Sequence, residues 1–153
     1  MKKGNLLLVD DEPMILTSLK FNFEEFADNI YTAENGMEAL ELLNKYEIHC
    51  VICDINMPGM TGVEVIKKIR ESGNNVPFVF YTAHGSNELM MEAVKYGAFD
   101  FLSKPSLDGI EDVITRGLKE GFQRNSSREK SEDSYISEYQ KLLDRIEKKD
   151  ESV

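Results

Sequence analysis

The sequence predicts a parallel, doubly wound α/β domain. Short apolar runs typical of buried strands alternate along the chain with segments whose apolar residues recur at helical spacing. This alternation places helices on both faces of a parallel sheet, because each crossover between parallel strands is usually made by a helix. The five strand-like runs are Asn5 to Val9, Ile30 to Ala33, Cys50 to Cys53, Phe78 to Tyr81 and Phe99 to Leu102.

The segments between these runs carry matching helical signals. Their apolar residues recur three or four positions apart, so that each set could cover the sheet. Pro13 suits the first position of a helix, and Thr61 with Glu64 has the spacing of a capping box, in which each side chain satisfies a free backbone N–H. The apolar sets are Ile15, Leu19, Phe23 and Phe26; Leu40 and Leu43; Val65, Ile66 and Ile69; and Ile110, Val113, Ile114 and Leu118.

Length and composition predict one domain with a short appendage. The 153 residues are 41% hydrophobic, enough for a real core. We expect a globular domain over residues 1–124, followed over 125–153 by a polar linker and an amphipathic helix. Residues 125–153 hold six Lys or Arg against eight Asp or Glu, so the globular part carries −8 of the net charge of −10. This acidity argues against direct binding of nucleic acid, which requires a basic surface.

The sequence carries no signal for export or membrane insertion. It has no run of about 18 apolar residues, and Met1-Lys2-Lys3 leads into a strand-like segment, so we expect a cytoplasmic protein. Cys50 and Cys53 lie three apart in one predicted strand and point to opposite faces, so they could neither form a disulfide nor bind one metal. We interpret both as core residues.

Three aspartates follow two of the predicted strands. Asp10 and Asp11 come directly after the first strand, and Asp54 comes directly after the third. If these strands are neighbours in a parallel sheet, their carboxyl ends converge in one crevice. The three carboxylates would then repel one another without a cation, and a hard divalent metal, most simply Mg²⁺, resolves the conflict.

Four motifs together resemble the bacterial two-component response-regulator receiver domain, of the chemotaxis-receiver type. They are Asp10-Asp11, the segment Asp54 to Gly62, Tyr81-Thr82-Ala83 and Lys104-Pro105, in the family's order and usual spacing over residues 5 to about 124. The resemblance implies a flavodoxin-like fold, a five-stranded parallel sheet of order 2-1-3-4-5 with helices on both faces. It also implies a phosphoprotein of signal transduction within a phosphorelay.

The resemblance assigns the acceptor and the metal ligands. Asp54 would accept a phosphoryl group from a phosphohistidine of a sensor histidine kinase or phosphotransfer protein and become an aspartyl phosphate. Asp11 would bind Mg²⁺ directly and Asp10 largely through water. Asp54 and the backbone carbonyl of Asn56 would complete the protein ligands.

The resemblance also assigns the phosphoryl contacts and the switch. Lys104 would pair with the phosphoryl oxygens, and the Thr82 hydroxyl would contact another of them. The Lys104-Pro105 bond is expected to be cis. Phe101 matches the aromatic residue that turns inward when Thr82 is drawn to the phosphoryl group, and Ala83 is small enough to admit this movement. The signal would then be read on the face formed by the fourth helix, the fifth strand and the fifth helix.

His84 occupies a position that in this family helps to set how fast the phosphoryl group hydrolyses. We expect Asn56 and His84 to flank the path of the attacking water and so to tune this rate. We expect slow self-dephosphorylation and no enzymatic turnover of outside substrates. A metal-dependent phosphohydrolase of the haloacid dehalogenase type also uses a strand-end aspartate with Mg²⁺. Its second acid would stand at Asn56, which cannot transfer a proton in that role, so this alternative is less favoured.

A second alternative is that the chain is the receiver module of a larger transcriptional activator or hybrid kinase whose output domain is absent. The segment Gly97 to Pro105 looks like the one common in receivers attached to transcriptional activators. Ile136, Tyr139, Leu143 and Ile146 follow a 3-4-3 spacing and predict an amphipathic helix over Ser134 to Lys149. A helix this short needs a partner surface, so we expect it to serve assembly, such as a homodimer, or binding to a downstream protein.

Overall fold

The structure is a computed structural model that describes the backbone of residues 2–83 and 86–151, without the side chains of 126–139 and 147–151. His84 therefore lies outside the described residues. The chain forms two compact units, Met1–Phe122 and Gln123–Val153. In the described part of the chain, no helix combines the length and apolar character needed to cross a membrane.

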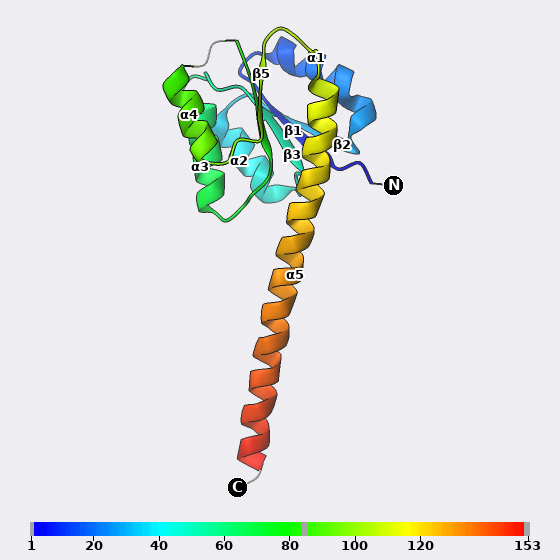
Figure 1. Ribbon diagram of the computed structural model, residues 1–153, viewed down its shortest axis with the longest axis vertical. Helices are drawn as coiled ribbons and strands as arrows, with labels where there is room; N and C mark the ends of the chain where they lie inside the picture. Colours follow the sequence, from blue (N-terminus) through cyan, green and yellow to red (C-terminus); the bar gives the residue numbers. More distant parts are fainter. Residues whose placement is uncertain (1, 84–85, 152–153) are drawn as a thin grey trace. The chain divides into compact units, whose positions relative to one another are not determined.

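The first unit contains a five-stranded sheet in which every neighbouring pair of strands is parallel (Figure 1). The strand order is β2-β1-β3-β4-β5, which confirms the predicted doubly wound topology. The strands are β1 (Asn5–Val9), β2 (Asn29–Ala33), β3 (Cys50–Cys53), β4 (Phe78–Thr82) and β5 (Asp100–Ser103). The last strand lies one residue later than predicted. Phe99 still donates its N–H to the Phe78 carbonyl, at 2.7 Å, directly before the strand begins.

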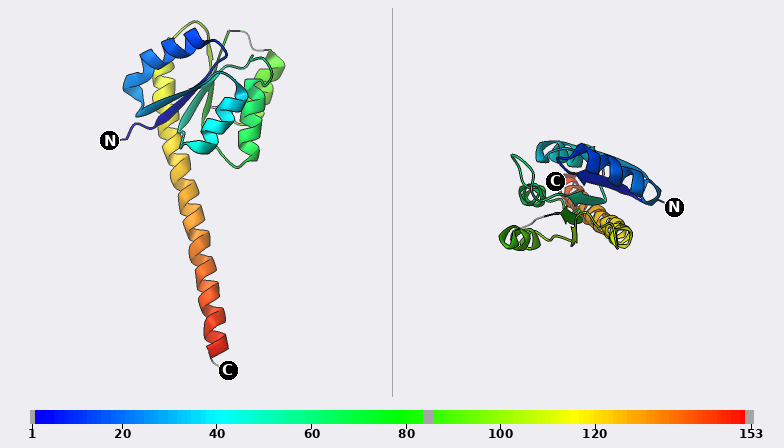
Figure 2. Two further views of the ribbon diagram at one scale, coloured as in Figure 1. Left: turned by 180° about the vertical axis from the view of Figure 1, so that it is seen from behind. Right: turned by 90° about the horizontal axis from the view of Figure 1, so that it is seen from above.

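Helices cover both faces of the sheet, as Figure 2 shows. One core cluster joins the sheet to α1 (Pro13–Phe23) and to the first turns of α5 (Ile110–Glu151). The other joins the opposite face to α2 (Gly36–Lys45), α3 (Gly62–Glu71) and α4 (Asn87–Lys95). A short 3₁₀ helix, η1 (Glu24–Phe26), follows α1. The strands are therefore buried on both sides, which explains their nearly continuous apolar composition.

Alternation along β3 shows how the sheet separates the two clusters. Val51 and Cys53 face the α2–α4 side, whereas Cys50 and Ile52 face the α1 and α5 side. Both cysteines are buried and free, which agrees with their interpretation as core residues on opposite faces.

Local signals fix where the helices begin. Pro13 opens α1. The capping box of α3 is present: the Glu64 N–H donates to Thr61 Oγ1 and the Thr61 N–H donates to Glu64 Oε2, each at 3.2 Å. A Cβ at Gly62 would collide with the Asp54 carbonyl oxygen, so the start of α3 lies directly against the end of β3.

The segment predicted to be a polar linker at the start of the tail has a helical backbone. The backbone of residues 125–134 is helical and belongs to α5, which continues to Glu151. This segment is polar but contains neither Gly nor Pro, and its Arg, Lys and Glu residues have good helix propensity, so nothing in it ends a helix. The helix predicted over Ser134 to Lys149 falls within α5. Among its described side chains, Leu142, Leu143 and Ile146 are exposed, and those of Ile136 and Tyr139 lie outside the described residues.

His49 ties the amino ends of two strands to α5. Its backbone N–H donates to the Asn5 carbonyl, and its ring Nδ1 accepts from the Asn5 backbone N–H, both at 2.9 Å. Its ring stacks on Phe122 with the centroids 4.1 Å apart. Its Nε2 lies 3.4 Å from Glu47 Oε1, without the geometry of a hydrogen bond. Burial lowers the pKa of His49, although the Glu47 carboxylate opposes this effect.

We predict that acid destabilises the fold through His49. Because its folded-state pKa is lowered, the neutral ring contributes stability that is fully present above the ordinary value of about 6.5 and is lost as pH falls toward the lowered value. A protonated Nδ1 would also oppose the Asn5 N–H as a second donor. The urea concentration at the unfolding midpoint should fall as the pH is lowered from 7 to 5.5, and His49→Gln should reduce this dependence on pH. Equal dependence on pH in the parent chain and His49→Gln would assign the effect elsewhere.

Candidate functional site

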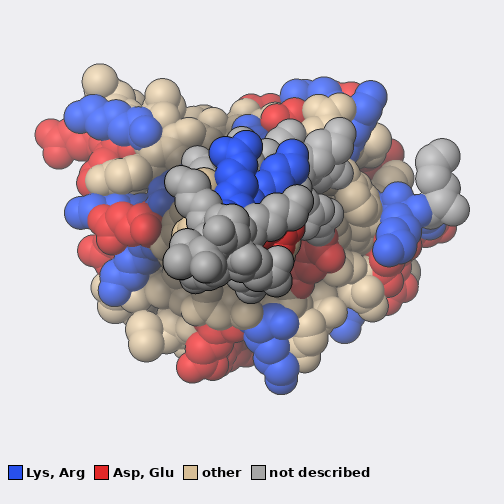
Figure 3. Space-filling model, turned by 90° about the horizontal axis from the view of Figure 1, so that it is seen from below, with Lys and Arg blue, Asp and Glu red and all other residues tan. Residues whose placement is uncertain are grey.

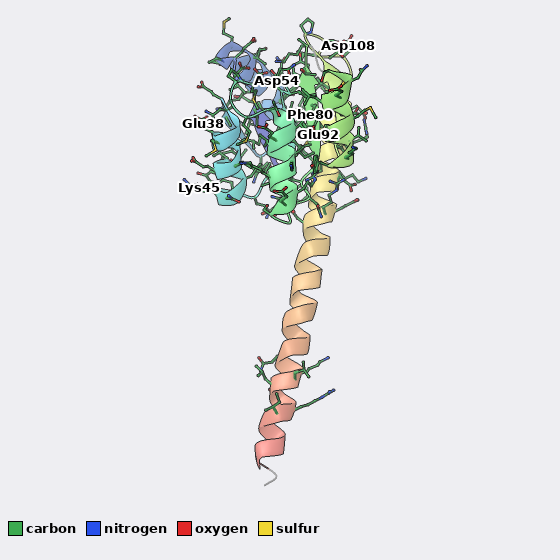
Figure 4. All side chains as sticks on the ribbon, turned by 90° about the vertical axis from the view of Figure 1, so that its left-hand side faces the viewer. Glu38, Lys45, Asp54, Phe80, Glu92 and Asp108 are labelled. Carbon is green, nitrogen blue, oxygen red and sulfur yellow. The ribbon has the colours of Figure 1, made fainter. Side chains whose placement is uncertain are left out.

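The three aspartates predicted to converge lie at the carboxyl ends of adjacent strands. The Asp54 N–H donates to the Val9 carbonyl at 2.9 Å, which joins the end of β3 to the end of β1. Carboxylate oxygens of Asp10, Asp11 and Asp54 all lie within 4.8 Å of one another. Asp10 and Asp54 are buried, with 2% and 7% of their surfaces exposed, whereas Asp11 is exposed. Figure 4 shows Asp54 at this end of the domain.

Lys104 connects two of these carboxylates. Its Nζ lies 2.6 Å from Asp10 Oδ2 and 3.1 Å from Asp54 Oδ2. Lys104 directly follows β5, and its backbone N–H donates to the Thr82 carbonyl at 3.1 Å. The peptide bond between Lys104 and Pro105 is cis, as predicted. The side chains of Lys104, Asp10 and Asp54 are only 11%, 3% and 9% exposed, so water screens this ion pair weakly.

Burial and pairing act on these groups in opposite directions. Burial raises the pKa of Asp10, although the hydrogen bonds from Lys104 and from the Glu12 N–H lower it. Burial lowers the pKa of Lys104, but hydrogen bonds to Asp10 and Asp54 outweigh it, and the net shift is upward. The pairing therefore keeps the ammonium charged, and a 3.0 Å hydrogen bond from the Glu12 N–H to Asp10 Oδ1 orients the neighbouring carboxylate.

The donor set fits a hard divalent cation. Three carboxylates and one ammonium leave two negative charges when all are ionised, and Mg²⁺ would balance them. The exposed Asp11 offers an oxygen on the solvent side, where a bound Mg²⁺ would keep some of its waters. The chain thus supplies oxygen ligands alone, which distinguishes the cluster from a zinc site with His or Cys ligands.

The other predicted site residues that the structure describes lie at or after the carboxyl ends of β3 and β4, or within β5. Thr82 ends β4 and is buried at 8% exposure, and Ala83 after it is exposed. Asn56, two residues after Asp54, is exposed, and His84 lies outside the described residues. Phe101 in β5 is half-buried on the α2–α4 side of the sheet.

The structure adds contacts that were not predicted. The Phe101 ring stacks on that of Phe80 with centroids 5.7 Å apart, because the two residues are register partners in β4 and β5. Lys104 Nζ lies 5.8 Å from the centre of the Tyr81 ring. Cys53 directly precedes Asp54, but burial raises the pKa of its thiol well above the usual value, so it remains a thiol. Only the register of β5 against β4 could have indicated the Phe80 contact in advance.

Comparison with known proteins gives consistent matches. The family described as response regulator receiver domain matches residues 6–115. The chain is 30% identical to the transcriptional regulatory protein FixJ of Bradyrhizobium diazoefficiens, over 85% of this chain and 62% of FixJ. It is 29% identical to sporulation initiation phosphotransferase F of Bacillus subtilis, over 77% of this chain and 96% of that protein.

Solved structures agree with these matches. The receiver domain of the Francisella response regulator 1452 superposes with a TM-score of 0.68 at 31% identity, over 76% of this chain and 97% of that one. The chain spans less than two thirds of FixJ, whereas it spans nearly all of the phosphotransferase.

We predict that removing the Lys104 charge destabilises the fold. Lys104→Met would leave Asp10 and Asp54 buried without their shared cation, and breaking such a buried pair costs about 3 kcal/mol. Lys67→Met is the matched control, because Lys67 is exposed and its replacement should stay within about 0.5 kcal/mol. Urea unfolding at pH 7 in metal-free buffer measures both. Equal stability of the two variants would show that the ion pair contributes nothing.

Proposed function

The chain belongs to the response regulator receiver domain family, and we propose that Asp54 is its phosphoacceptor in a Mg²⁺-dependent reaction. The donor would be a phosphohistidine of a sensor histidine kinase or a phosphotransfer protein. The observation that carries this proposal is the Lys104 ammonium, which lies 3.1 Å from Asp54 Oδ2 in a cluster of three carboxylates. This contact supports Asp54 as the acceptor and Lys104 as the cation that would meet the incoming phosphoryl oxygens.

The proposed transfer follows from this geometry. An Asp54 carboxylate oxygen attacks phosphorus, the bond from phosphorus to the donor imidazole nitrogen breaks, and the nitrogen keeps the electron pair. Bound Mg²⁺ would neutralise charge as the carboxylate and the phosphoryl group approach. The ion would be held by Asp11, Asp10, Asp54 and the Asn56 carbonyl. Lys104 would exchange its contact with Asp54 for one with a phosphoryl oxygen, and the Thr82 hydroxyl would donate to another.

We propose that Thr82 and Phe101 convert this event into a signal. Movement of Thr82 toward the phosphoryl group would vacate space near Ala83 and let Phe101 turn inward. Phe101 has no hydroxyl, so the change must be one of packing, beginning with its stack on Phe80 at 5.7 Å. The readout would be the α4-β5-α5 face, in two populations that differ in their phosphoryl contacts.

The comparisons bear on the two alternative functions, a phosphohydrolase and a receiver module of a larger regulator. None of the matches named above supports a haloacid-dehalogenase-like phosphohydrolase. A receiver module within a larger regulator remains a proposal, favoured by the match to part of FixJ. The match to the sporulation phosphotransferase, by contrast, extends over 96% of that protein.

Partners and location complete the proposal. The downstream target would be a protein rather than nucleic acid, because the net charge is −10, and acidic and basic side chains are interspersed on the face in Figure 3. A cytoplasmic location follows from the proposed kinase partner. We also propose that the exposed apolar residues Leu142, Leu143 and Ile146, or the α4-β5-α5 face, serve a homodimer or a partner.

The first functional prediction concerns the acceptor and the metal. Acetyl phosphate with Mg²⁺ should add one phosphoryl mass to the parent chain and none to Asp54→Asn, and EDTA should abolish the labelling. Asp11→Ala should weaken Mg²⁺ binding more than Asp10→Ala, because a direct ligand loses more than one acting through water. Mass spectrometry and calorimetry measure the two effects. Full labelling of Asp54→Asn would place the acceptor elsewhere.

The second prediction concerns the lifetime of the phosphoryl group. Asn56 and His84 are proposed to flank the path of the attacking water. His84→Ala or Asn56→Ala should change the rate of dephosphorylation about tenfold, which corresponds to about 1.4 kcal/mol in barrier height. Loss of labelled mass with time, after removal of acetyl phosphate, measures the rate. Rates within about twofold of the parent in both variants would identify these side chains as bystanders.

The third prediction concerns the tail. Truncation after Arg124 should leave acetyl phosphate labelling intact, because the acidic cluster and Lys104 lie within the first compact unit. It should change the association state measured by light scattering, because it removes the exposed Leu142, Leu143 and Ile146. Leu143→Glu in the full chain is the point-variant control. Unchanged mass in both would mark the tail as dispensable for assembly.

A further inference from the structure

Arg70 binds four backbone carbonyls that come from two other parts of the fold. It is the second-to-last residue of α3. Its Nε donates to the Tyr96 carbonyl at 2.8 Å, and Nη2 lies 3.4 Å from that of Gly97. Its Nη1 donates to the carbonyls of Val76, at 2.8 Å, and Asn74, at 3.0 Å. One guanidinium thus joins the end of α3 to the segment before β4 and to the turn after α4.

The acceptors on the α4 side are the carbonyls that a helix end leaves unsatisfied. Tyr96 is the C-cap of α4, and Gly97 turns the chain toward β5 with a φ of 81°. The last carbonyls of a helix have no intrahelical donor and carry the negative end of its dipole, so a cationic fork is well suited to them. The lysine ammonium is a single compact group, so it could not donate to all four of these carbonyls as the planar guanidinium does.

The remainder of α4 is held much less firmly. Ala93 is the single buried residue among the described residues of the helix, whereas Met91 and Val94 are 66% and 59% exposed. Its amino end is capped by the Ser86 hydroxyl, which accepts from the Leu89 N–H at 3.1 Å. This end follows the loop that starts after Thr82. The helix is therefore anchored at its carboxyl end by Arg70, whereas Leu89 and Met90 in its amino half pack on the core only partly buried.

The same anchor fixes the starts of the two strands that carry the proposed switch. Val76 precedes β4, and the Arg70 guanidinium lies 5.8 Å from the centre of the Phe78 ring. The Phe78 carbonyl in turn accepts from the Phe99 N–H at 2.7 Å, directly before β5. Arg70 therefore holds β4 and β5 at the ends that lie farthest along each strand from Thr82 and Lys104.

We propose that Arg70 is a positioning residue that makes the carboxyl end of α4 a fixed pivot for the switch. When the loop after Thr82 changes on phosphorylation, the amino end of α4 moves, while Tyr96 and Gly97 stay bound to Arg70. This inference rests on the proposed phosphoacceptor function. The anchor is the binding of Arg70 to the Tyr96 and Gly97 carbonyls, and the pivot is the persistence of this binding when the amino end of α4 moves. Experiment can separate the two, because the anchor exists without phosphate.

Hydrogen exchange of the full chain, read by mass spectrometry, tests the anchor without ligand. In Arg70→Gln, exchange of residues 93–98 should rise about tenfold, as expected for loss of hydrogen bonds to a charged donor worth about 1.4 kcal/mol. Arg70→Lys should lie between this variant and the parent. Arg116→Gln is the matched control, since Arg116 is exposed and pairs with the side chains of Asp112 and Asp100. Unchanged exchange at 93–98 in both Arg70 variants would overturn the anchor.

Beryllofluoride with Mg²⁺, as a phosphoryl mimic, tests the pivot. Within residues 86–98 of the parent chain, its effect on exchange should be confined to 86–91, and in Arg70→Gln it should extend through 98. The same extent in both proteins would overturn the pivot. Acetyl phosphate labelling is run in parallel and should be unchanged in Arg70→Gln. A parent chain that is not labelled overturns the phosphoacceptor function and the pivot with it, whereas the ligand-free comparison still decides the anchor.

Discussion

The burial of two like charges at one edge of the sheet is the constraint on which the rest of the structure depends. Asp10 and Asp54 are 2% and 7% exposed at the ends of adjacent strands, and Asp11 lies beside them. Lys104 resolves this conflict within the chain. It comes from the far side of β4, since the strand order is β2-β1-β3-β4-β5. The site can form only if all the strands between these residues are correctly paired, so folding and the assembly of the site are one process.

The two ends of the sheet are held by different kinds of interaction. At the carboxyl ends of the strands, charged groups are balanced in a way that a metal or a phosphoryl group can alter. At the opposite ends, His49 exchanges two hydrogen bonds with Asn5, and Arg70 binds four carbonyls. In the proposed switch, a rearrangement that begins at Asp54 would therefore leave these opposite ends fixed and would change mainly the amino end of α4.

The sequence predicted the features that depend on local pattern and on the convergence of parallel strands. Apolar runs placed the strands, and acids after two of them placed the cluster, because the ends of neighbouring parallel strands must meet. It did not predict the contact of Lys104 with Asp10, or the stack of Phe101 on Phe80. Both depend on side-chain reach and strand register, which no local pattern encodes. The helical backbone of 125–134 was missed because polar composition was taken as a linker, although helix propensity there is good.

The central claim is that Lys104 and a divalent cation share the neutralisation of the same carboxylates. The most direct test is a Mg²⁺ titration in which the side-chain ammonium of Lys104 is observed by NMR, with the exposed Lys67 as internal reference. Our account predicts a saturable shift of the Lys104 signal at the same Mg²⁺ concentration that saturates calorimetric binding, with the Lys67 signal unmoved. Saturable binding of Mg²⁺ without any change at Lys104 would contradict it.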